Sequence, residues 1–91
     1  LVVARDGTDK DAAARRAAVR DAHIERAKAM AQSGAMIIGG AMLDDDGAMI
    51  GSACIVEFDD RAALDAWLDS DPYVRGDVWR TIEVTPFCRA V

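Results

Sequence analysis

The chain has 91 residues, a net charge of −5 at neutral pH and a pI of about 4.6. The length fits one domain over residues 1–91, and a hydrophobic share of 52% argues against an intrinsically disordered chain. The acidic balance disfavours nucleic acids and anionic membranes as partners, and no apolar run approaches the roughly 20 residues of a membrane-spanning helix.

The first half of the chain begins with a strand pattern and continues with a long helical one. Residues 1–5 are apolar and β-branched, which is typical of a strand. Residues 9–33 are rich in alanine, and Gly34 is a natural stop for a helix. Thr8 and Asp11 form a weak capping box before this stretch.

We expect this helical stretch to break, because one helix of about 37 Å would overhang strands that span about 20 Å. The prediction is a short helical turn in 9–17, a change of direction near Arg20 and Asp21, and a main helix that ends at Ser33. The apolar stripe of the main helix contains Val19, His23, Ala27, Met30 and Ala31, with Ile24 beside it.

The second half predicts a hairpin, a second helix and a last strand. Residues 35–43 and 48–58 are apolar strands joined by a turn at 44–47, where Asp-Gly is a hairpin signal. Residues 59–71 predict a helix, which a following proline ends. After a loop over 72–80, residues 81–85 predict the last strand. The second helix should begin at Asp59 or Asp60 and bury a stripe of Ala63, Leu64, Trp67 and Leu68.

The order of these elements is β-α-β-β-α-β, which is the ferredoxin-like arrangement of the α+β class. Right-handed crossovers place both helices on one face of an antiparallel sheet. Strands 35–43 and 48–56 are nevertheless apolar on both faces. Because an apolar sheet face of this size should not stay in water, we expect two sheets to pack face to face in a homodimer.

His23 is the only histidine in the chain. A lone histidine on an apolar stripe is more often a structural residue with a satisfied hydrogen bond. If the helix breaks near Arg20, however, His23 lies in the first turn of the main helix, where the dipole disfavours added positive charge. The imidazole would then be neutral at pH 7, which is the form that a general base needs.

Asp71 precedes a proline at the end of the second predicted helix. Asp before Pro commonly begins a turn, and the spacing alone favours this structural interpretation. The alternative is that Asp71 orients His23 or handles a proton. Ser52 could face a pocket as a hydrogen-bond donor, and Tyr73 and Trp79 could wall a cleft.

No metal or cofactor site is predicted, because one histidine, two distant cysteines and scattered carboxylates do not match zinc spacing. Gly39 and Gly40 are too few for a dinucleotide fingerprint and indicate a bulge or a close backbone approach. Cys54 and Cys88 form no Cys-x-x-Cys pair. Two free, mostly buried thiols in a cytoplasmic protein are the expectation, with a disulfide left open to geometry.

Four local features together resemble the YciI family of YCII-related proteins. They are Arg20-x-x-His23-Ile24, Gly34 followed by an apolar strand with Gly39-Gly40, Gly51-Ser52 leading into "CIVEF", and Asp71-Pro72-Tyr73 followed by "VTPF" at 84–87. Their order and spacing extend over nearly the whole chain. The sequence departs from the family pattern at Asp21, where proline is usual, and at Ile24, where leucine is usual.

The resemblance implies a ferredoxin-like dimer of the dimeric α+β barrel superfamily. It also implies a catalytic pair in a pocket. The pair is His23 and Asp71, and the substrate-binding neighbours are Arg20, Gly40, Ser52 and Tyr73. The family includes a relative similar to a dehydrochlorinase of a chlorinated hydroxyquinol, and the fold looks like that of muconolactone isomerases.

We therefore expect an enzyme that moves a proton on a small acid or phenol, including ring-derived ones, without a cofactor. His23 would remove the proton, and Asp71 would fix the imidazole tautomer or return the proton. Elimination, dehydrochlorination or isomerisation would follow. Two other functions stay open: a metabolite-binding or sensor module that does not consume its ligand, and a structural dimerisation domain without a ligand-sized pocket near His23.

Overall fold

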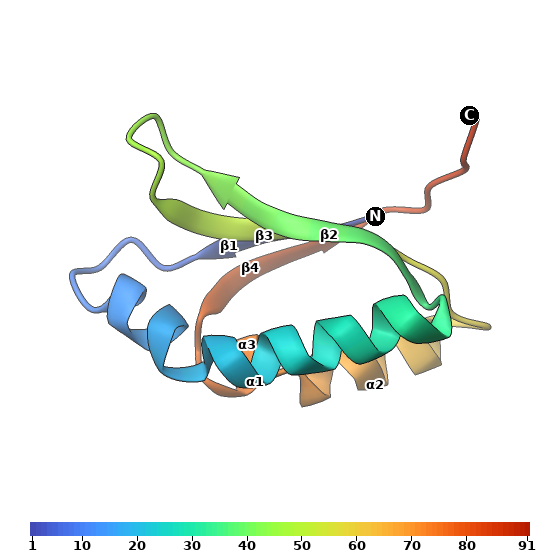
Figure 1. Ribbon diagram of the computed structural model, residues 1–91, viewed down its shortest axis with the longest axis horizontal. Helices are drawn as coiled ribbons and strands as arrows, with labels where there is room; N and C mark the ends of the chain where they lie inside the picture. Colours follow the sequence, from blue (N-terminus) through green and yellow to red (C-terminus); the bar gives the residue numbers. More distant parts are fainter.

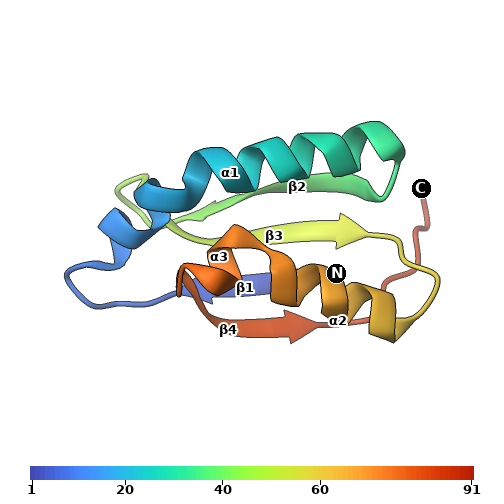
Figure 2. The same cartoon turned by 90° about the horizontal axis from the view of Figure 1, so that it is seen from below.

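The computed structural model describes residues 1–91 as one four-stranded antiparallel sheet with all helices on one face (Figure 1; Figure 2). The elements are β1 (Val2–Asp6), α1 (Ala12–Ser33), β2 (Met36–Leu43), β3 (Met49–Val56), α2 (Arg61–Ser70), α3 (Pro72–Arg75) and β4 (Trp79–Val84). The strand order is β2-β3-β1-β4. The predicted α+β, ferredoxin-like fold class is therefore confirmed.

Helix α1 is continuous from Ala12 to Ser33, so the predicted break near Arg20 and Asp21 is wrong. The 22-residue helix is about 33 Å long, and β2 and β3 with eight residues each span about 26 Å, so the overhang is smaller than the one that the prediction assumed. Its N-terminal part, in blue, runs at an angle to the rest instead of breaking (Figure 1). Gly34 ends the helix with φ of 86°, as predicted.

The start of α1 also differs from the prediction. Asp11 is the N-cap residue, but its side chain makes no capping hydrogen bond, so the capping box with Thr8 is wrong. The carboxylate of Asp9 instead binds the guanidinium of Arg15 through two hydrogen bonds of 2.7 and 2.6 Å. An ion pair within the loop and first turn takes the place of the side-chain cap.

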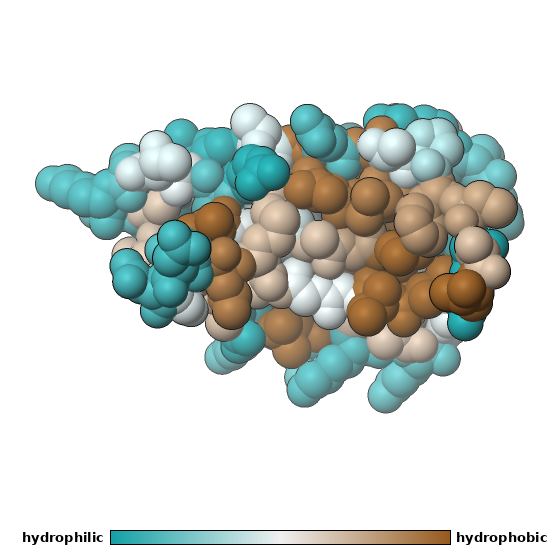
Figure 3. Space-filling view, turned by 90° about the horizontal axis from the view of Figure 1, so that it is seen from above, coloured by the Kyte–Doolittle hydropathy of each residue, from teal (hydrophilic) through white to brown (hydrophobic).

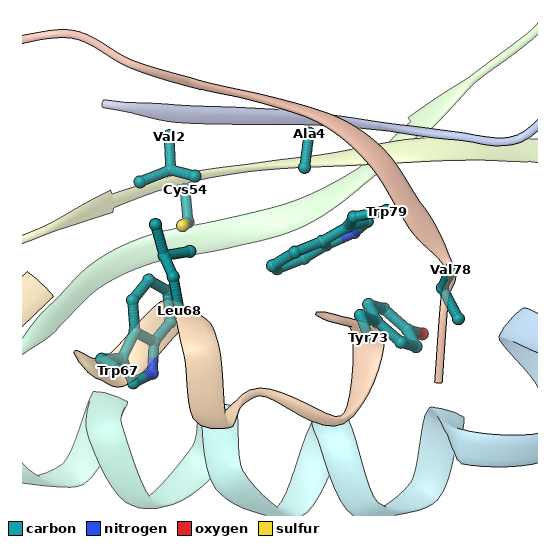
Figure 4. Packing of buried hydrophobic residues seen from close by; sticks show 8 residues of the cluster. All are labelled: Val2, Ala4, Cys54, Trp67, Leu68, Tyr73, Val78 and Trp79. Atoms are coloured by element: carbon teal, nitrogen blue, oxygen red, sulfur yellow. The ribbon is translucent and has the colours of Figure 1, made fainter. Parts of the chain in front are cut away.

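The core lies between the sheet and the helices. Its buried hydrophobic residues are Val2, Ala4, Cys54, Trp67, Leu68, Tyr73, Val78 and Trp79. Figure 4 shows the β1 and β3 side chains pointing toward the aromatic residues of α2, α3 and β4. In β1 and β3, Val2 pairs with Cys54 and Ala4 with Ser52, so alternation places all four on the helix-covered face.

Helix α2 follows its predicted pattern in part. The carboxylate of Asp60 accepts a hydrogen bond from the backbone N–H of Ala63 at 2.8 Å and so caps the helix. Trp67 and Leu68 are buried, Leu64 is half-buried and Ala63 is exposed. The apolar stripe is therefore narrower than the sequence predicted.

The predicted loop over 72–80 is wrong in two respects. Residues Pro72–Arg75 form the short helix α3, because proline at the first helical position is preorganised for it and Asp71 caps it. Strand β4 begins at Trp79, two residues before the predicted start, where it pairs with Asp6 beyond an irregularity in β1. The turn over 76–77 thus brings Trp79 into the core.

The face of the sheet opposite the helices is open (Figure 1). Figure 3 shows this face with apolar and pale residues over its centre and hydrophilic residues around the rim. Ile38 on edge strand β2 is 64% exposed, and a shallow hollow runs beside it along β2 and β3. None of the helices combines the length and apolarity needed to cross a membrane.

Candidate active site

His23 and Asp71 are 48 positions apart in the sequence and meet where α1 passes the junction of α2 and α3. The Nδ1 atom of His23 lies 2.8 Å from Oδ1 of Asp71. The same Oδ1 accepts the backbone N–H of Tyr73 at 2.9 Å, which caps α3. Asp71 therefore begins a turn and contacts His23 at the same time, so the two interpretations of this residue are not alternatives.

The carboxylate of Asp71 is 2% exposed, and its second oxygen is also occupied. Oδ2 accepts a hydrogen bond from Arg26 at 3.1 Å. The guanidinium of Arg26 also donates to the carbonyl of Trp67 at 2.9 Å and to the hydroxyl of Ser70. Arg26 was not among the predicted site residues, although its spacing of three residues from His23 places both on one helix face.

The contact with Asp71 determines which nitrogen of neutral His23 carries the proton. A carboxylate oxygen only accepts, so Nδ1 donates and Nε2 keeps its lone pair. The Nε2 atom has no hydrogen-bond partner in the protein. The ring stacks on Tyr73 with centroids 3.7 Å apart and meets the edge of Trp79 at 5.5 Å. Both neighbours hold the imidazole plane in a fixed orientation.

The position of His23 within α1 corrects one step of the sequence argument. Because α1 starts at Ala12, His23 lies near the middle of the helix and not in its first turn. The helix dipole acts within the first and last turns, so it does not favour the neutral imidazole here.

A cavity of about 170 Å³ lies against His23 between α1, β2 and β3. The predicted residues that line it are Arg20, His23, Gly40, Ser52 and Tyr73. Asp71 does not line the cavity and lies behind the imidazole. Aromatic walls come from Trp67, Tyr73 and Trp79. An apolar cavity of about 150 Å³ holds a benzene ring, so this one has room for a single small ring.

Ser52 presents a free hydrogen-bond donor to the cavity. Its Oγ accepts one hydrogen bond from Nη2 of Arg16 at 3.1 Å and one from Nε1 of Trp79 at 3.2 Å. Both partners can only donate, so the hydroxyl proton of Ser52 points to neither of them. No protein acceptor takes this proton, which leaves it for a ligand.

The cavity lining includes two arginines and no carboxylate. Arg16 is buried, pairs with Asp6 at 2.9 Å and lies 4.8 Å above the ring of Tyr73. Its Nε atom is buried without an acceptor. Arg20 is exposed and makes no ion pair or hydrogen bond with the protein. Arg20 was among the predicted substrate-binding residues, and Arg16 was not.

The comparisons with known proteins match this chain over nearly its full length. The model of the YCII-related domain matches residues 2–88. The chain belongs to the YCII-related family. It is 36% identical over 83 residues to proteins named YciI from Escherichia coli and Shigella flexneri, and each match covers 85% of both chains. The suspected membership is therefore confirmed.

A solved structure supports the same fold for this YCII-related protein. The chain is similar to 5-chloro-2-hydroxyhydroquinone dehydrochlorinase (TftG) from Burkholderia phenoliruptrix, in complex with 2,5-dihydroxybenzoquinone, with a TM-score of 0.81. The match covers 98% of this chain and 93% of that chain at 18% identity. At this identity the similarity shows the fold and not the reaction.

Two further groups in the cavity of the YCII-related protein are neutral. Burial raises the pKa of the Cys54 thiol to about 11 and also raises the pKa of the Tyr73 hydroxyl. Cys54 is a free thiol, as is the exposed Cys88, so the expectation that both are mostly buried is wrong for Cys88. Gly40, which has no side chain, contributes only backbone to the lining.

Proposed function

We propose that this YCII-related protein is a small-molecule enzyme in which His23 and Asp71 carry out proton transfer without a cofactor. The observation that carries the proposal is the buried Asp71 carboxylate, which holds Nδ1 of His23 at 2.8 Å while the imidazole lines a cavity. Nε2 of His23 then removes a proton from the ligand. Asp71 lies outside the cavity, so its role is to fix the tautomer and stabilise the imidazolium that forms.

The cavity supports a single-ring acid or phenol as the substrate. Its volume of about 170 Å³ and its aromatic walls suit one ring. Arg20 and the hydroxyl of Ser52 offer donors to an anionic oxygen, and Tyr73 offers a neutral hydroxyl. His23 supplies the acceptor for the proton that leaves. Backbone around Gly40 closes the β2 side of the cavity.

The proposed reaction is an elimination or an isomerisation. His23 takes a proton from an O–H or C–H bond, and the electron pair either expels a leaving group or moves a double bond. The imidazolium then returns the proton to the product or to water, which regenerates the neutral base. The dehydrochlorinase named above, which shares the fold, supports the elimination of chloride as the first reaction to test.

The direct test is incubation with 5-chloro-2-hydroxyhydroquinone, with chloride release and quinone absorbance as readouts. We expect turnover by the wild type, a loss of about 10²–10⁴-fold in His23→Ala, and little change in Lys28→Ala. Lys28 is an exposed residue of the same helix and serves as the matched control. Equal turnover in wild type and His23→Ala would contradict the proposed base.

The binding or sensor function makes a different prediction for the same experiment. It predicts saturable binding of a ring anion with no consumption of the ligand, which mass spectrometry of the incubated mixture measures. If the tested compound is not consumed, profiling of metabolites incubated with wild type and His23→Ala distinguishes an enzyme with another substrate from a sensor. A purely structural domain is disfavoured, because a ligand-sized cavity lies against His23.

We also propose that two copies pack through the open sheet face. The exposed Ile38 and the apolar centre of this face support a homodimer of the α+β barrel type (Figure 3). Light scattering should give about twice the chain mass of 9.8 kDa, and Ile38→Asp should give the single-chain mass. A wild-type mass near 9.8 kDa at micromolar concentration would refute the dimer.

Unpaired thiols at Cys54 and Cys88 support a cytoplasmic location.

A further inference from the structure

The pairing of His23 with the buried carboxylate of Asp71 affects whether the imidazole is neutral or positively charged. Asp71 is 2% exposed, and an ionised carboxylate so buried needs a positive partner. If His23 were the only partner, the pair would be most stable as imidazolium and carboxylate. A histidine held as imidazolium cannot accept a proton from a substrate. A second cation on Asp71 would weaken the attraction between the carboxylate and an imidazolium and so favour the neutral form of His23.

Arg26 lies at the position where such a cation would act. Its Nη1 donates to Oδ2 of Asp71 at 3.1 Å, on the oxygen that His23 does not contact. Its other terminal nitrogen binds the Trp67 carbonyl at 2.9 Å and the Ser70 hydroxyl, both in the last turn of α2. The guanidinium also lies over the indole ring of Trp67 at 5.7 Å. These contacts fix the charge beside the carboxylate.

The other charged or titratable groups around the imidazole do not replace Arg26. They are Arg16 and Arg20 on α1, Asp6 on β1, Cys54 on β3 and Tyr73 on α3. Arg16 is paired with Asp6, and neither contacts Asp71. Burial raises the pKa of Cys54 and of Tyr73, so both stay uncharged at neutral pH. Strand β4 contributes only Trp79 to this region.

We propose that Arg26 is a positioning residue that shares the negative charge of Asp71, so that His23 stays a neutral imidazole with its proton on Nδ1. The proposal deepens the proposed function, since it explains how His23 is kept ready as a base. It concerns the resting state of the site, however, and can be tested without a substrate. Arg26 acts through Asp71 and does not line the cavity.

The test is an NMR titration of His23 in the full chain, which is unambiguous because the chain has one histidine. Imidazole ¹⁵N shifts distinguish the Nδ1–H tautomer, the Nε2–H tautomer and the imidazolium. Loss of positive charge in Arg26→Met should move the titration curve of His23 to higher pH by about one to two units. Arg61→Met removes an arginine from an exposed ion pair on α2 and should leave the curve unchanged.

Two further variants separate charge from folding. Arg26→Lys keeps the charge and should keep the His23 curve close to that of the wild type. The double variant Arg26→Met with Asp71→Asn removes both charges and should return the curve to the wild-type position or below it. This variant also keeps the proposal testable if Arg26→Met does not fold.

An unchanged His23 curve in folded Arg26→Met would overturn the proposal, as would an Nε2–H tautomer in the wild type. A shift in Arg26→Lys as large as that in Arg26→Met would also overturn it, because charge would not be the cause. These outcomes are distinct from failure of the proposed enzyme. Absence of turnover leaves the titration result standing, and normal turnover in His23→Ala contradicts the base without affecting the charge balance.

Discussion

The substitution Asp71→Asn tests the buried site through folding stability. The carboxylate of Asp71 accepts from three donors, namely Nδ1 of His23, the backbone N–H of Tyr73 and Nη1 of Arg26. An asparagine has one acceptor oxygen and one NH₂ group that only donates. If the oxygen takes the place of Oδ1, the NH₂ group faces the guanidinium of Arg26. No orientation of the amide satisfies all three donors.

The expected cost follows from this count. One hydrogen bond to a charged group is lost, which contributes about 1.5–3 kcal/mol, and two donors then face each other in a buried place. We expect the free energy of unfolding to fall by about 2–4 kcal/mol. For a domain of this size, each kcal/mol lowers Tm by about 4–8 °C, so Tm should fall by about 8–32 °C.

Thermal unfolding followed by circular dichroism measures this change at one fixed protein concentration, because association would otherwise shift Tm. Asp65→Asn is the matched control, since Asp65 lies on α2 in an ion pair with Arg61 and its side chain is 52% exposed. That exposed pair contributes at most about 0.5 kcal/mol. A fall in Tm of less than about 3 °C for Asp71→Asn would refute the assigned burial and donor set.

Three further predictions concern other parts of the fold. A maleimide should label the exposed Cys88 quickly and the buried Cys54 only after unfolding, because burial raises the pKa of the Cys54 thiol to about 11; equal rates in the folded state would contradict this. Gly51→Ala should lower the free energy of unfolding, measured with urea, by about 2 kcal/mol or more, since the new Cβ would lie 2.4 Å from the carbonyl oxygen of Ala4; an unchanged free energy of unfolding would exclude that close approach. The guanidinium beside Asp9 holds the pKa of that carboxyl below its unfolded value, so its contribution to stability is present at neutral pH and lost on acidification. Asp9→Asn should therefore flatten the acid side of the stability–pH curve measured by urea unfolding, and an unaltered slope would contradict the ion pair.

The fold class could be predicted from the sequence because each element carries a local signal. The short apolar stretches of the strands, the Asp-Gly turn and the glycine after the first helix are each recognisable within a few residues. The break near Arg20 failed because it assumed strands of average length. The eight-residue strands β2 and β3 match the long helix α1, and strand length depends on pairing between distant segments.

The candidate site was predictable only in part, for a related reason. The resemblance to the family indicated His23 and Asp71, and the structure brings their side chains together. Arg16 and Arg26 were missed because a charged residue beside an apolar stripe normally faces solvent. Both become buried or half-buried through partners on other elements, Asp6 at the end of β1 and Asp71 between α2 and α3. The local sequence pattern around each arginine does not indicate such partners.

The tripeptide Asp71-Pro72-Tyr73 explains why the carboxylate of Asp71 could occupy a helix end that its charge does not favour. The C-terminus of α2 disfavours a negative side chain, but the same residue is the N-cap of α3, where its carboxylate accepts the N–H of Tyr73. Pro72 ends one helix and begins the other, so the cap position is fixed by the backbone. Tyr73 then stacks on His23. Asp71, Pro72 and Tyr73 thus provide the acceptor, the turn and the aromatic ring that orient the imidazole of His23. Arg26 provides the positive charge beside the carboxylate of Asp71.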